Sequence, residues 1–181
     1  MILITVGTEK FPFDRLMNWL DRLISKGFLN PNKEEIVVQY GSCTILPSEV
    51  RGFSVIPGHQ FQELVKKARL IIAHCGEGTI DLLSKINKPF ILVPRSERLG
   101  EHVDNHQQEL AEALKEKGIN VAASIEDLEV FLSNPFLIPI EFSPAAYYAE
   151  ASKMLEFLFS LESSPTNSNH LTNINLVANY V

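Results

Sequence analysis

The sequence lacks the features that would define its class at once: many cysteines, an excess of basic residues and a long apolar run. Its 181 residues include only two cysteines, Cys43 and Cys75, too few for a disulfide framework and typical of a reducing compartment. Sixteen scattered basic residues against 22 acidic ones give a net charge of −6, which argues against nucleic acid as a partner. No segment approaches the roughly 20 apolar residues of a membrane helix, and MILITVGT carries no basic leader. We therefore expect a soluble, cytoplasmic chain.

What the chain does have is a regular alternation of short apolar runs and segments of helical periodicity. Strands are predicted at 2–6, 35–39, 53–56, 70–73, 90–93 and 119–123. Helices are predicted from Leu16 to Gly27, over 61–68, from Thr79 to Ser84, from Val103 to Gly118 and at 125–132. The alternation indicates an α/β fold, a Rossmann-like parallel sheet with helices on both faces. We expect residues 1–161 to form one domain, with a last helix at 144–161 and a polar, flexible tail at 162–181.

Three polar loops follow predicted strands, and open parallel α/β sheets bind ligands beyond these strand ends. The loops are GTEKF (7–11), HCGEGT (74–79) and PRSERLGEHVDNHQ (94–107). The first two place glycine and a hydroxyl residue where a helix begins, so free backbone N–H groups can meet an anion. A phosphate or diphosphate fits this chemistry, although the glycine spacing matches neither the Walker P-loop nor the dinucleotide fingerprint G-x-G-x-x-G.

Other interpretations of the second loop stay open on its residues alone. Gly76 and Gly78 would also suit a sharp turn between a strand and a helix, with no ligand. Cys75 could be a nucleophile, but His74 is adjacent in sequence, where side chains diverge. We expect Cys75 to be a small residue that fills a crowded turn.

The third loop has alternatives of its own. His102 and His106 have the i, i+4 spacing of zinc ligands, but the glutamate of the H-E-x-x-H motif is missing, so we predict no metal. Residues 104–107 would equally suit a solvated first helical turn, where acidic and amide residues are favoured. Arg95 and Arg98 would equally be ordinary surface charges.

Taken in order, several motifs resemble those of a known family. They are VGT and FDRL (6–8 and 13–16), AHCGEGTI (73–80), KPFILVPR (88–95) and GEHVDNHQQELAEAL (100–114). They resemble the small, donor-binding subunit of bacterial two-subunit exopolysaccharide glycosyltransferases. More distantly, they are similar to the catalytic subunit of the eukaryotic dolichol-pathway N-acetylglucosaminyltransferase. The resemblance is to the glycosyltransferase family 28 C-terminal domain and covers roughly residues 1–132, which implies the donor-binding C-terminal half of a GT-B glycosyltransferase.

The resemblance implies a UDP-sugar donor and no cofactor. Carried over by position, the donor-binding residues would be Gly7 and Thr8 in the first loop, His74, Gly76, Gly78 and Thr79 in the second, and Arg95, Glu101, His102, Asn105 and Gln107 in the third. The catalytic residue stays unassigned, with His74 and His106 as candidates, because such enzymes usually take their base from the acceptor side. The chain departs from the family pattern at Cys75, commonly a glycine, and at Leu82, where related enzymes carry a ribose-binding glutamate.

The resemblance also implies half an enzyme, since the complete architecture closes two such domains around donor and acceptor. The partner would be a membrane-attached subunit that holds a polyprenyl-linked acceptor and brings this chain to the inner face of the membrane, with helix 144–161 as a candidate docking element. The expected function is transfer of a sugar to a lipid-linked saccharide in polysaccharide synthesis. A non-catalytic nucleotide-sugar-binding regulatory or scaffold module is the alternative, and a self-sufficient epimerase or cysteine hydrolase is a third. The sequence leaves the sugar, acceptor and linkage open.

Overall fold

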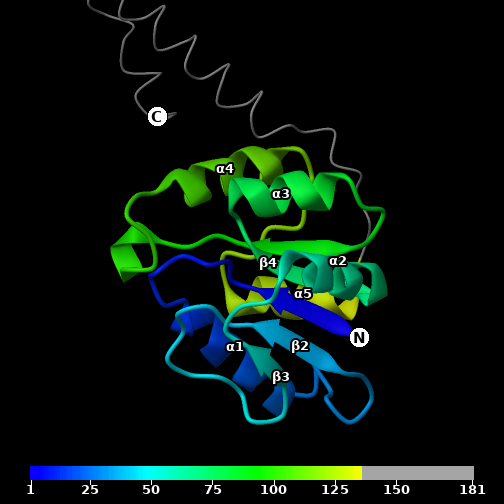
Figure 1. Cartoon of the computed structure of the whole chain (residues 1–181). Coiled ribbons are helices and arrows are strands. Elements are labelled where there is room, and N and C mark those ends of the chain that lie inside the picture. Colours follow the sequence, from blue (N-terminus) through cyan, green and yellow to red (C-terminus); the bar gives the residue numbers. More distant parts are fainter. Residues whose placement is uncertain (136–181) are drawn as a thin grey trace, which may run out of the picture. The chain divides into compact units, whose positions relative to one another are not determined.

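The computed structural model describes residues 1–135, and its centre is a five-stranded sheet (Figure 1). The strands are β1 (Ile2–Thr5), β2 (Ile36–Gln39), β3 (Arg51–Phe53), β4 (Leu70–His74) and β5 (Phe90–Val93), in the order β3-β2-β1-β4-β5. All neighbouring strands are parallel, and Ile4 of β1 lies opposite Val38 of β2 and Ile72 of β4. Every residue of β1, β2, β4 and β5 is buried, as in a sheet with helices on both faces.

The helices are α1 (Asp14–Ser25), α2 (Gly58–Lys67), α3 (Glu77–Ser84), α4 (His106–Glu116) and α5 (Ile125–Ser133), with a short 3-10 helix, η1 (Glu97–Leu99). Helices α1 and α5 share one core cluster with Ile4, Val38 and Ile72, which point to one face of the sheet. The alternate strand residues, such as Leu3 and Ile71, point to the other face. Figure 1 shows the sheet between α1 and the pair α3 and α4, so helices cover both faces.

Local sequence explains where two of these helices begin and end. Helix α1 buries Leu16, Met17, Leu20 and Leu23 along one stripe. It ends before Gly27, whose φ of 80° is a conformation that glycine adopts without strain. Helix α5 begins with a capping box, in which Ser124 and Asp127 each bond the other's backbone N–H. These signals fix the helices that close one face of the sheet.

The predicted α/β, Rossmann-like class is confirmed, while several boundaries differ. The predicted strand 53–56 is instead Arg51–Phe53, because β3 pairs with β2 only over these residues. The predicted strand 119–123 is reduced to a single bridge between Leu92 and Val121. Helix α4 begins at His106 rather than at Val103, whose apolar side chain is 59% exposed in the preceding loop.

Two further helices begin earlier than the sequence predicts. Helix α2 begins at Gly58 and α3 at Glu77, each preceded by an extended residue at its N-cap. The predicted helix 144–161 and the predicted tail 162–181 lie outside the described residues. Over residues 1–135, no helix is both long enough and apolar enough to span a bilayer.

Candidate functional site

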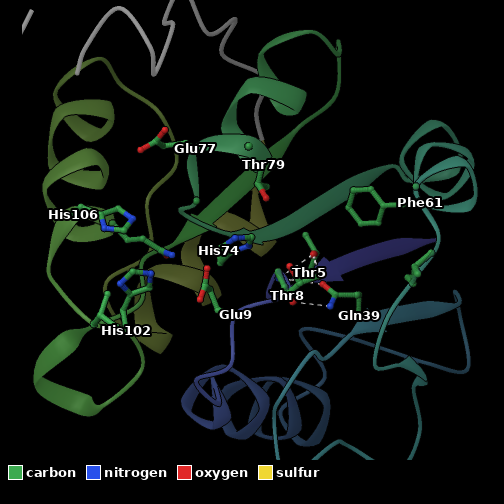
Figure 2. A pocket seen from close by; sticks show the side chains of 17 residues that line it. Thr5, Thr8, Glu9, Gln39, Phe61, His74, Glu77, Thr79, His102 and His106 are labelled. Carbon is green, nitrogen blue, oxygen red and sulfur yellow. Dashed lines mark hydrogen bonds between the residues drawn. The ribbon is translucent and has the colours of Figure 1, made fainter. Parts of the chain in front are cut away.

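A pocket of about 560 Å³ lies beyond the carboxyl ends of the central strands (Figure 2). From β1 the chain continues to β2 on one side, and β4 pairs with β1 on the other, so the pocket occupies the switch point of the sheet. The predicted donor-binding residues that line it are Gly7, Thr8, His74, Gly76, Gly78, Thr79, His102 and Gln107. The fold therefore brings parts of all three predicted loops to one cavity.

The first loop is fixed by Gln39, the last residue of β2. Its Oε1 accepts hydrogen bonds from the Thr5 hydroxyl (2.7 Å) and the Gly7 backbone N–H (3.1 Å). Its Nε2 donates to the carbonyls of Gly7 (2.7 Å) and Ser54 (3.1 Å). The amide thereby uses both N–H donors and two acceptor positions, and it holds Gly7 at a φ of 76°.

His74 ends β4, and its ring occupies the space between two glycines. A Cβ on Gly7 would lie 2.6 Å from His74 Cε1 and Nε2, and a Cβ on Gly76 would lie 2.5 Å from Nε2. Both positions therefore need glycine because of the imidazole between them, and not only because the chain turns there.

The same packing determines the charge of His74. Burial, followed by the nearby positive charge of Arg95, lowers the pKa of His74 to about 4, against a hydrogen bond with the Thr5 backbone that raises it. The imidazole is therefore neutral near pH 7. A neutral ring can exchange hydrogen bonds with a ligand, but so low a pKa makes it a weak general base.

The second loop turns from β4 into α3 at Gly76, an extended N-cap residue. The N–H groups of Thr79 and Ile80 both donate to the Gly76 carbonyl at 3.0 Å. Within the described residues no side chain caps this helix start, so the N–H groups of Glu77 and Gly78 stay available beside the pocket. Such a helix N-terminus is a favourable place for an anion.

Cys75 lies within this turn but does not open to the pocket. Its side chain is fully buried, and burial raises the pKa of the thiol to about 12. The thiolate is the nucleophilic form of cysteine, and a thiol with this pKa does not ionise near neutral pH. The structure thus favours the packing role for Cys75 over the nucleophile.

Arg95, by contrast, lies beneath the pocket rather than among its lining residues. It is fully buried, and its guanidinium donates to the carbonyls of Val6 (2.7 Å), Phe11 (2.8 Å) and Glu101 (2.9 Å). Burial lowers the pKa of Arg95. Because Val6 precedes the first loop, Phe11 is the last residue of that loop and Glu101 belongs to the third, Arg95 ties these two loops together.

The remaining predicted residues of the third loop divide between support and lining. Glu101 receives two hydrogen bonds of 2.9 Å from the Arg15 guanidinium, and a further one from the Ser96 N–H. Asn105 donates to the Glu97 carboxylate at 2.9 Å. His102 and Gln107 line the pocket, whereas Glu101 and Asn105 are not among its described lining residues.

Several lining residues were not singled out from the sequence: Thr5, Glu9, Gln39, Ile56, Gly58, Phe61, Glu77 and Val103. Figure 2 shows Phe61 at one end of the pocket and His102 with His106 at the other, with His74 between them. Phe61 gives one end of the pocket an aromatic ring, whereas the opposite end carries the imidazoles of His102 and His106. This polarity suits a ligand with a ring at one end and hydroxyl groups at the other.

Comparisons with known proteins identify the family of the chain. The chain is 37% identical over 83 residues to the UDP-N-acetylglucosamine transferase subunit ALG13 of Cryptococcus neoformans var. neoformans serotype D, in each of two strains. The match covers 44% of this chain and 38% of each relative, so the chain spans well under half the length of these relatives. A solution NMR structure of ALG13 is 18% identical, with a TM-score of 0.49, over 80% of this chain and 91% of that one. Residues 1–137 match the model of the glycosyltransferase family 28 C-terminal domain, and the chain therefore belongs to this family.

Proposed function

We propose that the pocket binds a UDP-sugar and that this chain is the donor-binding subunit of a glycosyltransferase. With a membrane-attached partner that holds the acceptor, it transfers the sugar to a lipid-linked saccharide. Membership of the family supports the donor class, and the relatives are named as subunits of a UDP-N-acetylglucosamine transferase. The sugar, the acceptor, a role in exopolysaccharide synthesis and attachment at the inner membrane face belong to the same proposal.

The observation that carries the proposal is the convergence of Gly7 and the start of α3 on the neutral ring of His74. Transfer from a UDP-sugar needs stabilisation of the diphosphate leaving group. Backbone N–H groups at a helix start supply it in a fixed geometry, and they need no reorganisation during the reaction. We assign the diphosphate to Gly7, Thr8 and residues 76–79.

The different side chains at the two ends of the pocket define the orientation of the bound donor. We assign the uracil ring to the end with the aromatic ring of Phe61, and the sugar to the end with His102 and Gln107. Arg95, Glu101 and Asn105 support the third loop in this assignment, since they bond other parts of the chain.

We do not assign His74 as the catalytic base. A general base works best with a pKa near the working pH, and burial holds the pKa of His74 near 4. His106, which lines the sugar end and is half-buried, remains a candidate. The partner that binds the acceptor is the other natural source of this group.

Calorimetric titration of the full chain with UDP tests the donor site. Thr79→Ala is expected to weaken UDP binding about tenfold or more, because one hydrogen bond to a charged group contributes about 1.5–3 kcal/mol. Gln107→Ala, at the end assigned to the sugar, is expected to weaken the binding of a UDP-sugar and to leave the binding of UDP unchanged. Ser84→Ala, at the far end of α3, and Gln108→Ala, beside Gln107, are the matched controls and keep the affinity of the unchanged chain. Absence of UDP binding at millimolar concentration would contradict the donor site.

Transfer is tested separately, in membranes that contain the chain together with an acceptor-binding partner. Labelled sugar is expected to reach the lipid fraction only when both proteins are present, and Thr79→Ala is expected to reduce this transfer. Transfer that is unchanged in a variant with lost UDP binding would favour the alternative, a nucleotide-sugar-binding scaffold.

A further inference from the structure

At the sugar end of the pocket, two imidazoles meet one carboxylate. His102 Nδ1 lies 3.0 Å from Asp104 Oδ1, and His106 Nδ1 is also in hydrogen-bond contact with that oxygen. The two rings stand edge to face, with centroids 4.5 Å apart and planes at 89°. His102 is buried, with a side chain 6% exposed, so at least one member of the group has a fixed position.

We propose that His102, Asp104 and His106 form a binding site for a divalent transition metal ion such as Zn²⁺. One ligand atom from each residue lies within 4.8 Å of the others. Zn²⁺ takes nitrogen and oxygen ligands at about 2.0–2.1 Å in a tetrahedron, which places neighbouring ligand atoms about 3.3 Å apart. The 3.0 Å separation of His102 Nδ1 and Asp104 Oδ1 is close to this spacing.

The donor set decides the class of metal. Two imidazoles with one carboxylate favour Zn²⁺ and its transition-metal neighbours over Mg²⁺ and Ca²⁺, which prefer oxygen ligands alone. His102 and His106 also line the pocket, so the remaining coordination positions are open to an oxygen ligand from inside it.

This site departs from the expectation of no metal, which rested on the missing glutamate of H-E-x-x-H. The loop before α4 supplies the third ligand instead, because it brings Asp104 between the two histidines. The site uses only side chains of this chain, and it does not depend on the proposed UDP-sugar. The two ideas can therefore fail separately.

The test is calorimetric titration of the full chain with Zn²⁺ alone, without UDP. One Zn²⁺ is expected per chain, and Asp104→Asn and His106→Gln are each expected to weaken its binding about tenfold or more. The side chains of Asp104 and His106 are both at least partly exposed, so the two variants are expected to fold. His59→Gln, on the exposed face of α2, is the control and leaves the affinity unchanged.

Co²⁺ provides a second readout, because its visible spectrum distinguishes nitrogen and oxygen ligands from cysteine thiolates. The Co²⁺ spectrum of the unchanged chain is expected to lack thiolate bands. His106→Gln is expected to abolish the spectrum of the bound ion. Zn²⁺ affinity that is unchanged in both Asp104→Asn and His106→Gln, or that is lost in a control variant, overturns the proposal. UDP binding in the presence of a chelator reports on the donor site alone, so the two failures are distinguishable.

Discussion

Acidification is expected to destabilise the fold through His74. In the folded protein, burial and the charge of Arg95 hold the pKa of His74 at about 4, whereas an unfolded histidine has a pKa of about 6.5. Between these values the unfolded chain binds a proton that the folded chain does not. The contribution of His74 to stability is therefore complete above about pH 6.5 and falls towards pH 4. Because His74 is almost completely buried, the difference amounts to about 3 kcal/mol.

The assay is urea unfolding at a series of pH values from about 7.5 to about 4.5. His74→Gln is the comparison, since glutamine keeps a polar side chain and does not titrate. Carboxylates that ionise in the same range affect both proteins equally. Over this range the free energy of unfolding is expected to fall by about 2.5 kcal/mol more in the unchanged chain than in the variant.

Two results would refute this reasoning. The first is a pair of stability curves that stay parallel across the whole pH range. The second is an NMR titration in which the His74 ring of the folded protein gains its proton near the ordinary histidine pKa of about 6.5. Either result would mean that the ring is not held neutral by its packing.

Substitutions at the pocket floor give the other predictions, each measured by urea unfolding. Gly7→Ala is expected to cost about 2–4 kcal/mol, because its φ is 76° and its Cβ would strike His74; an unchanged midpoint contradicts this. Gly76→Ala is expected to cost about 1–3 kcal/mol by the same clash, whereas Gly78→Ala, whose Cβ meets no described atom within 4 Å, is neutral or stabilising. Arg95→Met is expected to cost about 3 kcal/mol or more by leaving three carbonyls unpaired, and a loss below about 1 kcal/mol argues against that role.

The central strands could be predicted from the sequence because they are buried on both faces. Runs such as LIIA and FILV are apolar throughout, and the pattern alone identifies them. The edge strand β3 could not be placed in the same way, since Arg51 and Gly52 are exposed and only pairing with β2 defines it. Val103 misled the prediction of α4, because an exposed apolar residue in a loop imitates helical spacing.

The glycines and hydroxyl residues of the pocket could also be found from the sequence, because strand ends and helix starts identify anion sites. Gln39 could not, since its role depends on the register that places it opposite Thr5 of β1. Arg95 and Glu101 were predicted to face the donor, but their long side chains turn into the protein, where Arg95 bonds the carbonyl of Val6 and Glu101 bonds Arg15 of α1. The family resemblance implied a ligand in both cases, whereas burial decided the partner.

The most direct test of the central claim, a donor site between the first loop and α3, is an NMR titration of the ¹⁵N-labelled chain with UDP. The backbone amide signals of Gly7, Thr8 and residues 76–79 are expected to shift together and to saturate with one affinity. Signals near the opposite end of the sheet, such as those of Lys33 and Glu35, are expected to stay in place. Absence of shifts at millimolar UDP, or shifts confined to residues away from the pocket, would contradict the account.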